Sequence, residues 1–293
     1  GLFVRFTSDA GEFDLKWTTG GVNTLDNMTA IVARGLALYT LDKGEWIWVG
    51  TARPNRQDKA SSFRITCSKL AGSQHEYMLY LSLYNEVTSL QIGVPEGSTI
   101  AASSLNSPRA EKPIIIYGTS IMQGASASHP GMCSSNQLSR RLDRVVINLG
   151  FSGNGKLDYE IAELMAAHPD PAVFVMDNIP NCGADLIREK TPGFVKILRD
   201  AHPDVPIVFV ENPIYPGARF DDAREKEVTS RNEALAEVYA GFKKAGMKKI
   251  YYVKGDKMLG ADNTGTIEGT HFTDLGFESY VKILYPVLKK LCK

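Results

Sequence analysis

Hydrophobic positions in the first third of the chain come in short runs that turn signals separate. Seven runs alternate apolar and polar residues or are rich in β-branched and aromatic ones, at residues 4–6, 13–17, 37–39, 46–49, 63–66, 76–81 and 89–94. Clusters such as Asp9-Ala10-Gly11 and Asp42-Lys43-Gly44 lie between them. Regularly spaced short strands without long amphipathic helices are typical of two packed sheets. Residues 1–105 are therefore predicted to form an all-β sandwich.

The hydrophobic pattern changes after residue 113. Apolar runs at 114–116, 145–147, 172–176, 207–210 and 250–253 have the composition of strands buried on both faces of a parallel sheet. Helix-period segments at 134–142, 157–167, 191–201, 225–245 and 273–291 alternate with them. This alternation predicts a three-layer α/β/α domain over residues 113–293. The segment 106–112, within a stretch rich in proline, serine and charged residues, is predicted to link the two domains.

Composition narrows the class of protein. A chain of 293 residues with 43% apolar residues can bury a sizeable core. Its 33 basic residues balance its 33 acidic ones, which disfavours a nucleic-acid partner. The sequence contains no apolar run of about 18 residues or more, the length that spans a bilayer. Residues 1–7 show no signal peptide, although residues upstream of this sequence could carry one.

The four cysteines, Cys67, Cys133, Cys182 and Cys292, stand far apart in the chain. They form no CxxC pair, which argues against a zinc knuckle or a thioredoxin-like motif. We expect ordinary buried thiols, and spacing alone leaves one disulfide open.

Two of the three tryptophans, Trp46 and Trp48, point to the same face of a predicted strand. A paired aromatic face can stack on a sugar, but large aromatic side chains also dominate cores and domain interfaces. We expect the second arrangement and assign these tryptophans no binding role.

Polar residues follow the predicted parallel strands where each strand ends. Because ligands of open α/β sheets bind beyond the carboxyl ends of the strands, the chemistry is expected there. A serine becomes a nucleophile only with a base, an orienter for that base and donors for the oxyanion. Ser120 is the candidate nucleophile, His271 the general base and Glu268 its orienting carboxylate. The N–H groups of Ser120 and Gly153 and the amide of Asn181 are the candidate oxyanion hole.

Each of these residues also has an ordinary structural interpretation. Ser120 alone would be a helix N-cap, His271 a surface or cap histidine, and Gly153 and Asn181 turn residues. What favours chemistry is that four separate strand ends supply complementary groups. Other motifs fit less well, because residues 118–124 lack the Lys-Ser/Thr of a phosphate-binding loop and the G-F-S-G-N-G turn at 150–155 is only loosely like a dinucleotide fingerprint. No G-x-S-x-G elbow surrounds Ser120.

The motif blocks of the second half resemble those of the SGNH (GDSL-type) hydrolases. In order, they are Gly118-Thr119-Ser120 with Gly124, then Gly153, then Asn181, then Glu268-Gly269-Thr270-His271. The resemblance covers residues 113–293 and narrows, through the phrases at 123–132 and 148–155, to the bacterial branch in which a jelly-roll-like β-sandwich precedes the SGNH domain. It implies an exported esterase, periplasmic or secreted, acting on a small-molecule or glycan ester.

Three positions depart from the family pattern. Thr119 stands where the family usually has Asp, and Asn181 lies in I-P-N-C rather than G-x-N-D. Glu268 replaces the usual Asp, and its extra methylene changes the reach to the imidazole. Asp274 and Asp262 are alternative orienters, although Asp274 suits the N-cap of the last helix.

The expected activity is hydrolysis of a carboxylic ester through an acyl-enzyme, without a metal or an organic cofactor. A small acyl group such as acetyl is favoured, because no long apolar, lid-like segment is available to cover a fatty chain. Together with the carbohydrate substrate that the resemblance implies, this makes a carbohydrate O-acetyl esterase the expected enzyme. The alternatives are a lipase, lysophospholipase or thioesterase that uses the same residues, and a glycan-binding protein with a weakly active SGNH domain.

Overall fold

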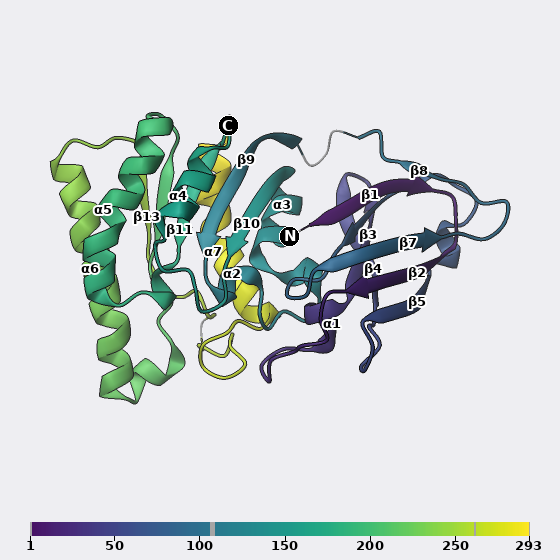
Figure 1. The fold of residues 1–293 in the computed structure, drawn as a ribbon, viewed down its shortest axis with the longest axis horizontal. Helices are drawn as coiled ribbons and strands as arrows, with labels where there is room; N and C mark the ends of the chain where they lie inside the picture. The colour runs from purple at the N-terminus through teal and green to yellow at the C-terminus, as the bar shows by residue number, and fades with distance from the viewer. Residues whose placement is uncertain (1, 106–108, 261, 293) are drawn as a thin grey trace.

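The computed structural model describes residues 2–105, 109–260 and 262–292. An all-β half and a half that alternates strands and helices lie side by side (Figure 1). The strands are β1 (Phe3–Ser8), β2 (Glu12–Thr19), β3 (Leu36–Asp42), β4 (Glu45–Ala52), β5 (Ala60–Thr66), β6 (His75–Tyr80), β7 (Val87–Gly93), β8 (Ile100–Ala102), β9 (Arg109–Gly118), β10 (Arg144–Gly150), β11 (Val173–Asp177), β12 (Ile207–Val210) and β13 (Ile250–Val253). The α-helices are α1 (Ala30–Arg34), α2 (Ser120–Gln123), α3 (Ser134–Leu142), α4 (Tyr159–Ala166), α5 (Ala184–Ala201), α6 (Asp222–Lys244) and α7 (Asp274–Leu291).

The N-terminal half consists of two antiparallel sheets, with strand orders β4-β3-β6-β1-β8 and β5-β2-β7. Apolar side chains of both sheets, among them Phe6, Phe13, Trp17 and Tyr77, form one buried cluster. The period-2 pattern of each strand produces this core, because every second side chain faces the other sheet. The seven predicted strands are confirmed, with ends that differ by at most three residues, while β8 and helix α1 were not predicted.

The C-terminal half contains a five-stranded parallel sheet with the order β10-β9-β11-β12-β13. Successive residues of β9 alternate between its two faces: Ile114 and Ile116 belong to one buried cluster, and Ile115 and Tyr117 to another. Helices α2, α3 and α7 contribute to the first cluster, α4 and α5 contribute to the second, and α6 contributes to both. The predicted three-layer arrangement with a parallel sheet is therefore confirmed.

Helix α5 begins earlier than the pattern predicts. The helical period predicted this helix over residues 191–201. The helix instead starts at Ala184 and continues through Pro192. Its buried side chains Ile187, Phe194 and Leu198 belong to one core cluster, so tertiary packing outweighs the lost N–H of the proline.

The α/β half packs against the face of the five-stranded antiparallel sheet that points away from the core of the sandwich. Tyr39 and Tyr80 are buried there, and the guanidinium of Arg140 from α3 lies 4.2 Å from the centre of the Tyr39 ring. Trp48 stacks flat on His129 at 5.1 Å and is still 53% exposed, so it lies at the interface between the halves rather than in the sandwich core.

Strand β9 begins at Arg109, inside the segment predicted as a linker, and pairs there with Arg144 of β10. Residues 106–108 of that segment lie outside the described residues. The boundary between the two domains therefore stays a prediction.

All four cysteines are free thiols in the structure, with Cys133 and Cys182 buried and the other two partly exposed. Among the helices that the structure describes, none is long and apolar enough to cross a membrane.

Candidate active site

The sequence-predicted site residues converge at the carboxyl edge of the parallel sheet. Ser120 follows β9, Gly153 follows β10, Asn181 follows β11, and Glu268 and His271 lie in the loop between β13 and α7. Except for Glu268, all of them line one pocket of about 290 Å³. The strand-end rule thus placed the five residues at the same edge.

Ser120 is the first residue of α2, and its hydroxyl does not cap that helix. The N-cap is Thr119, whose Oγ1 accepts a hydrogen bond from the Ile121 N–H at 3.2 Å. The alternative interpretation of Ser120 as a helix cap is therefore wrong. Ser120 is buried, with only 9% of the residue exposed. Because its hydroxyl does not cap the helix, it can contact other groups.

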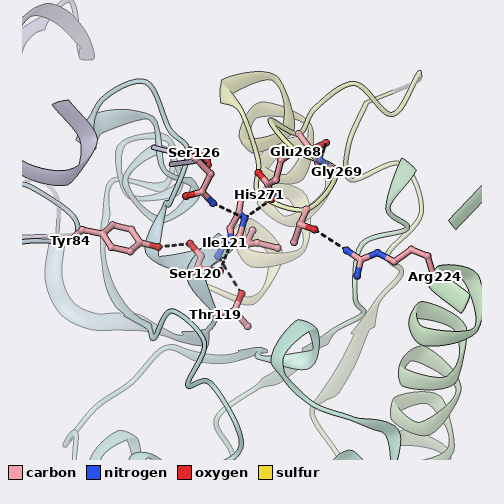
Figure 2. A network of polar contacts seen from close by, with 12 residues as sticks. Tyr84, Thr119, Ser120, Ile121, Ser126, Arg224, Glu268, Gly269 and His271 are labelled. Atoms are coloured by element: carbon pink, nitrogen blue, oxygen red, sulfur yellow. Dashed lines mark hydrogen bonds and ion pairs between the residues drawn. The ribbon is translucent and has the colours of Figure 1, made fainter. Parts of the chain in front are cut away.

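The Ser120 hydroxyl and the Glu268 carboxylate contact opposite nitrogens of the His271 ring. Ser120 Oγ lies 2.7 Å from His271 Nε2, and Glu268 Oε1 lies 2.6 Å from His271 Nδ1. Figure 2 shows the three side chains pointing toward one another. If Nδ1 carries the proton, Nδ1–H donates a hydrogen bond to Glu268 Oε1, and Nε2 is left as a base directed at Ser120. The geometry is that of a serine nucleophile with an oriented general base.

A tight turn explains how the longer Glu268 fits. Gly269 has a φ of +89°, in the left-handed region that side chains rarely adopt, so glycine is required there. The turn brings Glu268 Oε1 back to the main chain, where it also accepts from the His271 N–H at 3.0 Å. The backbone thus compensates for the extra methylene.

The two alternative orienters have other partners. Asp274 Oδ1 accepts from the Ser128 N–H at 2.9 Å, and Asp262 Oδ1 accepts from the Thr264 N–H at 3.2 Å and from the Thr264 hydroxyl at 2.8 Å. The expectation that Asp274 caps α7 is also wrong, since the N-cap is Thr273 and Asp274 is the first helical residue. Of these three carboxylates, Glu268 is the one in contact with His271.

Three candidate oxyanion donors face the same pocket. Ser120, as the first residue of a helix, has an N–H without an intrahelical acceptor. Gly153 has a φ of +72°, and its N–H has no acceptor among the described residues. The network around Asn181 selects the amide orientation in which the oxygen accepts from the N–H groups of Asn154 at 3.2 Å and Gly155 at 3.1 Å. This orientation leaves the NH2 group of Asn181 available as a donor.

The far wall of the pocket includes Tyr215 and Thr270, which sequence inspection did not single out. Burial raises the pKa of Tyr215 to about 12, so its phenol stays neutral. Arg224 of α6 holds this wall in place, because it donates to Thr270 Oγ1 at 2.8 Å and its guanidinium lies 4.4 Å from the Tyr215 ring centre.

Two side chains from the all-β half also reach the site. Asn27 lies 2.9 Å from His271 Nδ1, and the Tyr84 hydroxyl donates to the Ser120 carbonyl at 3.4 Å. Nothing in the sequence around Asn27 or Tyr84 marks them, since both lie in loops whose polar residues resemble ordinary turns.

Comparison with known families identifies the chain. A model described as the GDSL-like lipase/acylhydrolase family matches residues 111–289. The chain belongs to this family. A second model, for the N-terminus of SGNH-type esterases, matches residues 1–100. The resemblance inferred from the motif blocks, including the preceding all-β half, is confirmed, and the chain is accordingly a hydrolase of the SGNH/GDSL type.

Solved structures show the same architecture. A candidate GDSL-like lipase from Bacteroides ovatus is 36% identical, with a TM-score of 0.93 over 99% of this chain and 84% of that one. A salicylyl-acyltransferase from a tetracycline biosynthetic pathway is 18% identical, with a TM-score of 0.76 over 99% and 82%. A family two carbohydrate esterase from Clostridium thermocellum, solved with cellohexaose, is 14% identical, with a TM-score of 0.68 over 99% and 92%. The last two show the fold alone. A comparison with curated proteins found no match.

Proposed function

We propose that this SGNH-type hydrolase is a serine esterase that removes small acyl groups, acetyl above all, from carbohydrates. The observation that carries the proposal is the pair of contacts on the His271 ring, 2.7 Å to Ser120 Oγ and 2.6 Å to Glu268 Oε1. Contacts on both ring nitrogens fix the tautomer and orientation that a general base needs.

In the proposed first step, Ser120 Oγ attacks the carbonyl carbon of the ester while His271 Nε2 takes its proton. The N–H groups of Ser120 and Gly153 and the NH2 group of Asn181 donate to the developing oxyanion. The tetrahedral intermediate then collapses, and the leaving alcohol takes the proton from His271. Water attacks the acyl-enzyme in the same manner, which releases the acid and returns the proton to Ser120.

The size of the pocket supports a small acyl group. At about 290 Å³, the pocket next to Ser120 lies at the lower end of the range for small-molecule sites. Its walls at Thr270 and Tyr215 are polar or carry a hydroxyl, which suits a sugar ester better than a fatty chain. The carbohydrate acceptor rests on likeness of fold to the family two carbohydrate esterases.

A second candidate is hydrolysis of longer acyl esters. A groove of about 460 Å³ that Asn27 and Asp274 line also includes the apolar side chains of Met28, Ile267 and Leu275. The last two are more than half exposed, and an apolar surface of this kind can accept an acyl chain. The two candidates differ in where the acyl group lies relative to His271.

The direct test is hydrolysis of p-nitrophenyl esters by wild-type protein and by Ser120→Ala. We expect the variant to lose turnover of the acetate by about four orders of magnitude or more, with an unchanged melting curve. In the wild type, kcat/KM should fall from acetate to octanoate. Turnover by Ser120→Ala at the wild-type rate would refute the nucleophile, and a rise towards octanoate would favour the second candidate.

The carbohydrate acceptor needs its own assay. Acetate release from acetylated xylan, mannan and pectin identifies the polymer, and absence of release from all three would remove the acceptor from the proposal while leaving the esterase chemistry in place. An exported location, periplasmic or secreted, belongs to the same proposal, and cell fractionation tests it.

A further inference from the structure

The loop before helix α1 brings an amide of the all-β half against the imidazole of His271. Asn27 Nδ2 lies 2.9 Å from His271 Nδ1, the nitrogen that Glu268 Oε1 also contacts. The two contacting residues are 244 positions apart in the chain. Two side chains, one from each half of the molecule, therefore share one ring nitrogen.

The position of Asn27 is fixed by contacts across the interface between the two halves. Ser126, in the loop after α2, donates its hydroxyl hydrogen to the Asn27 carbonyl at 2.6 Å. Two residues further on, the Thr29 hydroxyl caps α1 by accepting from the Val32 N–H at 3.2 Å and contacts the Ser128 carbonyl at 3.5 Å. The Ser126 contact holds the main chain of Asn27 without using the Asn27 side chain, whereas the Thr29 contacts stabilise the start of α1.

The orientation of this amide decides which tautomer of His271 it supports. An NH2 group facing Nδ1 requires Nδ1 to be an acceptor, which would place the ring proton on Nε2 and prevent it from taking the Ser120 proton. It would also place the Glu268 carboxylate against the lone pair of His271 Nδ1, which is repulsive. Turned about, the amide presents Asn27 Oδ1 to His271 Nδ1 at the same place, 2.9 Å away. That orientation agrees with the productive tautomer, because Nδ1–H then has the Asn27 amide oxygen and the Glu268 carboxylate as acceptors.

We infer that Asn27 is a second positioning residue for His271, whose amide oxygen shares the Nδ1–H with Glu268, so that the all-β half completes the proposed active site. The inference rests on the proposed roles of Ser120 and His271.

A neutral acceptor complements what Glu268 can provide. The Glu268 side chain is 40% exposed, so water screens its charge and competes for its oxygens. The Asn27 amide oxygen is neutral and holds the ring without adding charge. Among the other charged groups near the loop, Asp26 precedes Asn27 and lines the same groove as Asp274 of α7. Asp274 accepts from the Ser128 N–H, and Arg224 of α6 donates to Thr270.

The test compares Asn27→Ala, Asn27→Asp and a matched control, Thr29→Ala, with p-nitrophenyl acetate as substrate. Asn27→Ala is expected to lower kcat roughly tenfold to a hundredfold with little change in KM, because it loosens the base rather than the substrate. Asn27→Asp keeps an acceptor in nearly the same shape and should recover most of kcat. Its added carboxylate stabilises the imidazolium, so the acid-side limb of the kcat/KM profile should move to higher pH. Thr29→Ala loses the cap and should lower Tm without changing kcat or that limb.

Three results would overturn the inference: kcat of Asn27→Ala within twofold of wild type, a loss in Asn27→Asp equal to that in Asn27→Ala with an unmoved pH profile, or a loss in Thr29→Ala equal to that in Asn27→Ala. Ser120→Ala, measured alongside, distinguishes failure of the proposed function from failure of the role of Asn27. If it retains turnover, the proposed function fails. If it is inactive and any of the three results is found, only the role of Asn27 fails.

Discussion

The two halves of the molecule contribute to the site in different ways. In the α/β half, five candidate residues come from the carboxyl ends of the strands, and the parallel sheet brings them together. In the all-β half, Asn27 and Tyr84 come from loops that reach the site only because the halves are docked. The first contribution follows from topology, whereas the second depends on one interface.

This difference predicts two kinds of variant. Changes in the α/β residues should alter the chemistry and leave the stability of the protein nearly unchanged. Changes at the interface between the halves should alter stability and act on chemistry only through the contacts of that half with His271 and Ser120. Three predictions test this separation, in order of decreasing effect.

Glu268→Gln should give the largest effect. The amide can no longer accept as an anion, so it holds the tautomer and stabilises the imidazolium less well, and kcat should fall roughly 10²- to 10⁴-fold. Asp274→Asn is the matched control, because an amide oxygen can still accept from the Ser128 N–H. Steady-state kinetics on p-nitrophenyl acetate checks both, and a larger loss in Asp274→Asn than in Glu268→Gln would move the orienting role to Asp274.

Asn181→Asp should come next. The carboxylate can still accept from the N–H groups of Asn154 and Gly155, but it brings a negative charge where the amide donated. Loss of one oxyanion donor lowers kcat roughly 10²- to 10³-fold. Unchanged kcat in a variant that melts like the wild type would remove Asn181 from the oxyanion hole.

The contact between the halves should respond to pH through His129. Burial against Trp48 and Tyr39 lowers the pKa of His129 to about 4 from its ordinary 6.5. The unfolded chain therefore binds a proton below pH 6.5 that the folded protein binds only near pH 4. Stability that is present above pH 6.5 is lost as the pH falls towards 4, by at most roughly 3 kcal/mol from this group.

His129→Phe isolates this contribution, since the ring can still stack on Trp48 without titrating. Urea unfolding at pH 7.5 and pH 4.5 should show a smaller difference between the two pH values for the variant than for the wild type. Equal differences would show that His129 stays uncoupled from folding.

The sequence predicts the strands and their order along the chain better than individual side-chain contacts. Runs such as 114–116 identify strands buried on both faces, because period and composition are local properties. The strand-end rule then placed Ser120 and His271 at one edge, although 151 residues separate them. It did not show that Thr119 rather than Ser120 caps α2, since both residues are suitable caps.

The contribution of the all-β half could not be predicted. Asn27 is one of several polar residues in a turn-like loop, and its role depends on how that loop docks against Ser126. Docking is a property of two surfaces, and neither is visible in the local pattern of the other. The start of α5 was missed for a similar reason, because core packing, not local propensity, carries the helix through Pro192.

The central claim is that Ser120 forms a covalent intermediate. A p-nitrophenyl alkylphosphonate ester reacts with an activated serine and stays attached, so intact-mass measurement and peptide mapping locate the nucleophile. The account predicts one adduct, on the peptide that contains Ser120, formed with release of p-nitrophenol and absent from Ser120→Ala. An adduct on another residue in the wild type, or an equal adduct in Ser120→Ala, would contradict it.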